Sequence, residues 1–193
     1  MSFNAKSVAD SLWIESNGGP LLLLPEALLP SWSGTDAPSD RDVEATFRWQ
    51  GSGPASDYDR ACDVQDYVGV IPVGAGSALV LGDEPLPTRW ISTPDGGLLA
   101  RWIFAESDAA AEQALTRIPA ELSWEPVGAF VVRSSPLRLI DSADGGSDLI
   151  LPSARIEMQP GTYAVTWSRF AFDSETALLL VRLSRDQAPR PSA

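Results

Sequence analysis

The sequence predicts a single α+β domain that consists mainly of antiparallel β-sheet built from hairpins, with about two short helices. Three observations support this fold class. Several segments alternate apolar and polar residues, Gly-containing turns separate many of these segments, and only two stretches combine a capping residue with helical spacing. The 193 residues suffice for one domain with a hydrophobic core. We expect this domain to span 1–186, followed by a flexible tail over 187–193.

The first predicted element is a buried hairpin. Trp13 and Ile14 have side chains typical of strands, and Leu21–Leu24 form a short apolar run that ends at Pro25. The turn between them contains Asn17–Gly19, and these residues readily adopt the positive φ angles of a tight hairpin turn. A polar loop follows this hairpin.

The later strands are predicted from alternation and from the turns that bound them. Glycine-containing turns at 74–76 and 94–97 indicate two further hairpins, and the last third of the chain is again β. In chain order, the predicted strands cover 43–50, 70–73, 78–81, 88–92, 98–104, 127–133, 137–141, 155–158, 162–172 and 177–183.

Two short helices complete the prediction. Ser56 starts the first, over 57–68, because Asp59 can reach back as the second half of a capping box. The second helix covers 107–118, is rich in alanine, and ends before Pro119.

The composition excludes several kinds of site. The chain has no histidine, so the commonest general base and transition-metal ligand are missing and a Ser-His-Asp triad is impossible. Cys62 is the only cysteine; it can form neither an internal disulfide nor a zinc site by itself, and we expect it to be a small core residue. Neither the turn at 17–19 nor the turn at 74–76 has the pattern of a phosphate-binding loop. We therefore expect no cofactor and no bound metal.

The first residues and the hydropathy indicate a soluble cytoplasmic protein. The stretch 1–12 has neither the charged nor the apolar region of a secretory signal. No run approaches the roughly eighteen apolar residues of a membrane helix.

The chain is strongly acidic, with 14 basic and 26 acidic residues and a formal net charge of −12. Such a chain repels phosphate backbones, so we expect no nucleic-acid partner. Two explanations remain open. The charge can serve solubility alone, or it can attract a basic protein partner over a long range.

Two acidic clusters are candidates for such a partner-binding surface. Asp59, Asp63 and Asp66 have the spacing of one face of the first helix, and Asp83 and Glu84 lie in a turn between strands. Carboxylates at these positions would attract a basic partner. The alternative is that the helix face and the turn are simply solvated.

A second functional alternative is a small metal-dependent hydrolase. Asp57, Asp59, Asp83 and Glu84 would then hold a divalent cation or act as an acid and a base. A third is a regulatory or scaffold module. Arg60 and Arg101 could also pair with these acids inside the fold, because arginine suits bidentate contacts to carboxylates.

Four segments resemble immunity protein family 21, a family of bacterial polymorphic-toxin immunity proteins: Trp13–Leu21, Asp57–Cys62, Leu79–Pro85 and Arg101-Trp102. The resemblance covers roughly residues 12 to 105. It implies a cytosolic, non-catalytic α+β protein, encoded beside a toxin, that binds and neutralises that toxin. The resemblance does not specify which residues contact the toxin.

Overall fold

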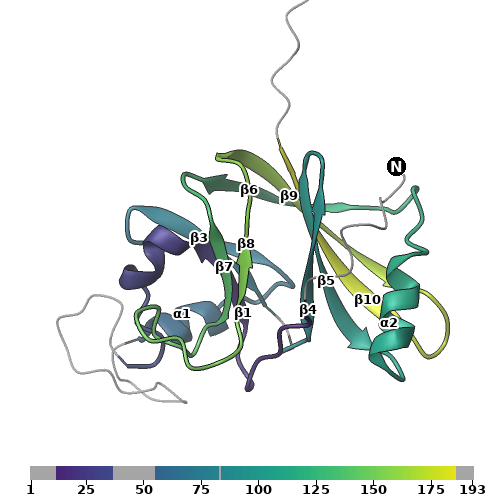
Figure 1. Ribbon diagram of the computed structural model, residues 1–193, viewed down its shortest axis with the longest axis horizontal. Coiled ribbons are helices and arrows are strands. Elements are labelled where there is room, and N and C mark those ends of the chain that lie inside the picture. Colours follow the sequence, from purple (N-terminus) through teal and green to yellow (C-terminus); the bar gives the residue numbers. More distant parts are fainter. Residues whose placement is uncertain (1–11, 37–54, 83, 186–193) are drawn as a thin grey trace, which may run out of the picture.

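The computed structural model describes residues 12–36, 55–82 and 84–185 (Figure 1). In this part of the chain 46% of the residues are in strands and bridges and 13% in helices, which confirms a mainly antiparallel β domain with a few short helices. The predicted strand at 43–50, the predicted tail at 187–193 and Asp83 lie outside the described residues.

The strands form two five-stranded antiparallel sheets. The first sheet has the order β2-β3-β1-β7-β8, with bounds Gly69–Val73, Gly76–Leu81, Leu21–Pro25, Leu137–Asp141 and Ala154–Ile156. The second has the order β4-β5-β10-β9-β6, with bounds Thr88–Thr93, Gly96–Phe104, Ala177–Arg185, Gly161–Ala171 and Glu125–Val132. Every strand predicted within the described residues from 70 onward is confirmed, with small differences at its ends.

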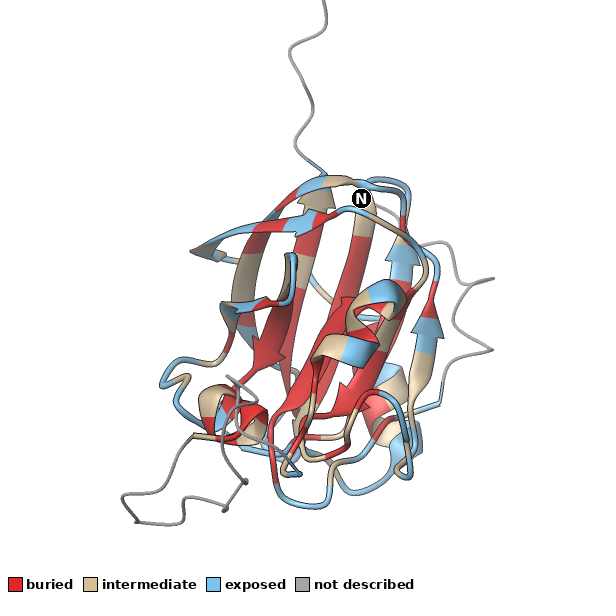
Figure 2. Ribbon diagram, turned by 90° about the vertical axis from the view of Figure 1, so that its left-hand side faces the viewer, coloured by how far each residue is buried: buried red, intermediate tan, exposed pale blue. Residues whose placement is uncertain are grey.

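The main core lies between the two sheets, where alternate residues from each sheet meet. Leu23 of β1 and Leu79 of β3 belong to this core, together with Val181 of β10 and Phe130 of β6 from the facing sheet. Figure 2 shows that the strands are buried along much of their length.

The outer face of each sheet is covered as well. The short helix η2 (Glu26–Ser31) and α1 (Asp57–Cys62) pack over the first sheet, and α2 (Asp108–Leu115) packs over the second. The strand β1 therefore lies between two apolar layers, which explains why its run of leucines is continuous rather than alternating.

Both predicted helices exist, but both are shorter than predicted. Ser56 and Asp59 form the expected capping box, yet α1 ends at Cys62 instead of continuing to 68. Residues 63–67 instead run beside the β3–β4 connection, where the Tyr67 carbonyl accepts a hydrogen bond from Arg101. Ser107 caps α2, which ends at Leu115 rather than at 118. No helix in the described ranges is long and apolar enough to span a membrane.

The predicted first hairpin is wrong. Residues around Ile14 do not form a strand against β1; Ile14 makes a single bridge to Thr88, in the second sheet. Both edges of β1 are occupied by other strands, with Leu22 opposite Val80 of β3 and Ile140 of β7. A fully apolar strand is most stable in the middle of a sheet, so the turn before it carries the chain from one sheet to the other.

Candidate functional site

Several connecting segments gather where β1 begins and where β3 and β7 end, along the lower edge of the molecule in Figure 1. We call this region the loop end. It consists of 16–20, 32–36, α1 with 63–67, 84–86 and 142–151. Connecting loops held by a rigid scaffold are where binding residues most often occur.

The segment before β1 is held by side-chain hydrogen bonds. The Ser16 hydroxyl accepts hydrogen bonds from the backbone N–H groups of Gly18 (3.1 Å) and Gly19 (3.0 Å). The N–H of Asn17 donates to the buried carboxylate of Asp141 at 2.8 Å. Gly18 has a φ of 130°, which favours glycine. This part of the surface is therefore fixed in one conformation.

Tyr58 of α1 packs against this segment. Its ring leaves no room for a Cβ at Gly19, so the glycine permits close packing of the helix. Burial raises the pKa of the Tyr58 hydroxyl to about 12, and the neighbouring Cys62 thiol contributes to the shift. Cys62 is exposed, so the prediction that it is a core residue is wrong. Partial burial of its thiol beside Tyr58 raises the pKa of that thiol.

Arg101 connects two segments of the loop end. Its side chain is fully buried, and its guanidinium donates hydrogen bonds to the carbonyls of Tyr67 (3.1 Å), Gly82 (2.9 Å), Leu81 (3.3 Å) and Glu84 (2.8 Å). These four bonds go to main-chain carbonyls. Arg101 thereby fixes 63–67 beside 84–86. The expected pairing of Arg101 with the acids of this loop stays a prediction, because Asp83 lies outside the described residues.

Two of the predicted acids are buried and have structural partners. Asp57 accepts hydrogen bonds from the Ser33 N–H and from Arg60, each at 2.8 Å, which confirms the expected pairing of Arg60. Asp59 is 6% exposed, and its carboxylate accepts from the Ser56 N–H (2.7 Å) and hydroxyl (2.9 Å). The prediction that Asp59 belongs to an exposed acidic stripe is wrong, because the residue completes the cap of α1.

The remaining predicted acids in the described residues lie on the surface. Asp63, Asp66 and Glu84 are exposed, and Asp66 follows the end of α1 rather than lying on its face. Gly82 contacts the Asp66 carbonyl so closely that no Cβ would fit there. The two clusters recognised separately in the sequence are therefore adjacent, although Asp83 lies outside the described residues. Their role in binding a partner stays a prediction.

Asp57, Asp59 and Glu84, the described members of the set predicted for a hydrolase, are not grouped as a metal site. Asp57 and Asp59 are buried among their own hydrogen-bond partners, whereas Glu84 is exposed. Across 12–36, 55–82 and 84–185, no three or more His, Cys, Asp or Glu side chains are grouped so that they could hold a metal ion.

Sequence reasoning missed the loop between β7 and β8, at 142–153. Asp144 is buried in this loop, and its carboxylate accepts hydrogen bonds from the N–H groups of Ile150 (3.1 Å) and Leu151 (2.8 Å). The length of this loop could have identified it from the sequence, because the other hairpins are connected by the shorter segments 74–75, 94–95 and 172–176. Long connections inside compact domains are often functional.

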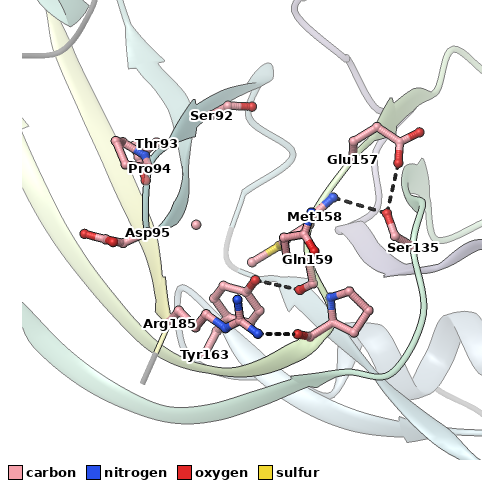
Figure 3. Close-up of a pocket in the computed structure, with 12 residues that line it drawn as sticks. Ser92, Thr93, Pro94, Asp95, Ser135, Glu157, Met158, Gln159, Tyr163 and Arg185 are labelled. Atoms are coloured by element: carbon pink, nitrogen blue, oxygen red, sulfur yellow. Dashed lines mark hydrogen bonds between the residues drawn. The ribbon is translucent and has the colours of Figure 1, made fainter. Parts of the chain in front are cut away.

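A cavity of about 310 Å³ lies at the opposite end of the molecule, where β7 begins (Figure 3). Tyr163 donates to the Gln159 carbonyl (2.6 Å), and Arg185 donates to the Pro160 carbonyl (2.9 Å). Its tyrosine and arginine are therefore already hydrogen-bonded within the protein. We do not consider it the functional site.

Comparison with protein families gives one result that bears on function. A family model described as immunity protein 21 matches residues 12–176. No curated protein and no solved structure matches the chain. The match extends well beyond the range of 12 to 105 expected from the sequence, and it includes every segment of the loop end.

Proposed function

The chain belongs to the immunity protein 21 family, and we propose that it is a non-catalytic bacterial immunity protein that binds and neutralises a cognate toxin in the cytoplasm. The observation that carries this proposal is the family match over 12–176. An immunity protein needs a preformed binding surface rather than catalytic residues. A stable complex needs about 800 Å² of such a surface on each partner, which a domain of this size can supply.

The loop end supports the proposal because hydrogen bonds to buried side chains hold its segments in place without a partner. Arg101 holds 63–67 and 84–86 together, and Asp141 holds the segment before β1. A surface already in its bound conformation loses little conformational entropy on association, so more of the contact energy contributes to affinity.

We propose that the exposed acids of the loop end face the toxin and that the toxin presents a basic surface to them. Asp63, Asp66 and Glu84 are exposed on 63–67 and 84–86, which Arg101 holds side by side, and the chain as a whole has a net charge of −12. Opposite charges on two proteins accelerate their encounter more than they strengthen the final complex.

We therefore expect the triple variant Asp63→Asn/Asp66→Asn/Glu84→Gln to associate with the toxin about tenfold more slowly at low salt. Its association rate should also depend less on ionic strength, while its dissociation rate changes less, because the removed charges act over a distance. The measurement is stopped-flow association with the toxin domain encoded beside this chain's gene, at several salt concentrations.

A matched control removes the same number of charges elsewhere. Glu106, Glu121 and Glu125 are exposed around α2 and the start of β6, and their replacement by Gln should slow association much less. Equal slowing by the two triple variants would show that only the net charge matters. A wild-type chain that does not bind this toxin would contradict the proposed function itself.

A further inference from the structure

The loop between β7 and β8 is fastened to the segment that follows η2. The Gly146 N–H donates to the Trp32 carbonyl at 2.8 Å, and the Trp32 indole N–H donates to the Ser142 carbonyl at 3.0 Å. The N–H of Thr35 donates to the Ala143 carbonyl at 3.2 Å. These bonds, together with the buried Asp144, make the loop a fixed part of the surface.

Ile150 is presented on this fixed loop. Its side chain is 80% exposed, although its own N–H is bound to the Asp144 carboxylate and the preceding Leu149 packs against the apolar layer over the first sheet. A large apolar side chain exposed on a backbone that is held in place is suited to fill a pocket on a partner, because little backbone freedom remains to be lost.

An acidic hollow of about 400 Å³ lies on the same loop. Among the described residues, Trp32 and Gly145 contribute to its lining, and Asp36 and Asp148 carry exposed carboxylates beside it. The Asp36 carboxylate lies 3.9 Å from the position that a Cβ on Gly145 would take, so it reaches across to the loop. Such a hollow is complementary to an arginine or lysine side chain.

The loop is continuous with the acids of the loop end. The Ser33 N–H binds Asp57 at 2.8 Å, and the Tyr58 N–H donates to the Gly34 carbonyl at 3.0 Å. The segment 32–36 therefore links the loop on one side to α1 on the other, and α1 leads directly to Asp63.

We propose that the β7–β8 loop is the apolar centre of the toxin interface, with Ile150 filling an apolar pocket on the toxin and a basic toxin side chain entering the hollow between Asp36 and Asp148. This inference rests on the proposed function and specifies its binding surface. The occupant is a basic protein surface, because both carboxylates of the hollow and the net charge of the chain are negative.

The test is surface plasmon resonance with the toxin domain encoded beside this chain's gene. Ile150→Ala should weaken binding about tenfold, mainly through faster dissociation, and Ile150→Arg should weaken it at least as much. The double variant Asp36→Asn/Asp148→Asn should weaken binding several-fold. Ile150→Ala should leave the thermal unfolding temperature unchanged, because the side chain is mostly in solvent.

Val131→Ala is the matched control. Val131 is a 41% exposed apolar residue of β6 in the second sheet, away from the loop end, and we expect its truncation to leave affinity unchanged. Wild-type affinity in both Ile150 variants would overturn this inference and leave the proposed function standing. A wild-type chain that does not bind the toxin would overturn the proposed function, and this inference with it.

Discussion

Arg101→Met should destabilise the fold by about 3–5 kcal/mol, because several buried carbonyls lose their hydrogen-bond donor and each unsatisfied group costs about 1–3 kcal/mol. Methionine can occupy much of the space of the arginine stem but donates no hydrogen bond. The carbonyls of Tyr67, Gly82 and Glu84 would lose the donor that now holds them together. Urea unfolding monitored by tryptophan fluorescence measures the change in free energy.

Arg182→Met is the matched control, because Arg182 also lies in a strand of the second sheet. Its guanidinium stacks on the Trp124 ring at 4.1 Å, and its Nε has no hydrogen-bond partner among the described residues. We expect a loss of only about 1 kcal/mol there. Equal losses for the two arginines would contradict the role assigned to Arg101.

Trp32→Ala should cost about 3–5 kcal/mol, because it removes a large buried side chain from the layer over the first sheet. It also removes the donor to the Ser142 carbonyl, so the β7–β8 loop should become more mobile. Trp32→Phe keeps most of the apolar packing and should cost clearly less. Thermal unfolding gives the stabilities, and hydrogen exchange at Gly146 reports the loop.

The hydrogen-exchange result at Gly146 tests whether Trp32 holds the β7–β8 loop. If Trp32→Ala leaves hydrogen exchange at Gly146 at the wild-type rate relative to global unfolding, then Trp32 does not hold the loop. Trp124→Ala, which truncates a half-buried tryptophan over the second sheet, should leave exchange at Gly146 unaffected.

Most strands could be predicted because their local pattern and their final environment agree. The alternation in 162–172 and the glycine-containing turn at 94–97 specify a strand and a hairpin without knowledge of the rest of the chain. The first hairpin could not be predicted, because the partners of β1 lie far away in the sequence. Nothing near Leu22 shows that Val80 and Ile140 will occupy both of its edges.

The end of α1 was missed for a related reason. The residues that follow it contact Gly82 in the β3–β4 connection, and Arg101, from the other sheet, holds that connection. The helix start was predictable because Ser56 and Asp59 are only three residues apart and bond to each other.

The candidate site was predicted in part. Charge indicated Asp63, Asp66 and Glu84, and the structure places them on the surface of two segments that lie side by side. Charge also indicated Asp59, which is buried. The sequence does not distinguish an aspartate that caps a helix from one that faces solvent. Ile150 was missed, since its exposure depends on how Asp144 folds the loop around itself.

The central claim is that this chain neutralises a toxin by binding it, and growth of a toxin-expressing host tests that claim most directly. The toxin domain encoded beside this chain's gene is induced alone, with the wild-type chain, or with the Ile150→Arg variant at equal expression. We expect the wild-type chain to restore growth and to co-purify with the toxin, and the variant to restore growth poorly. Continued growth arrest with abundant, folded wild-type chain would contradict the account.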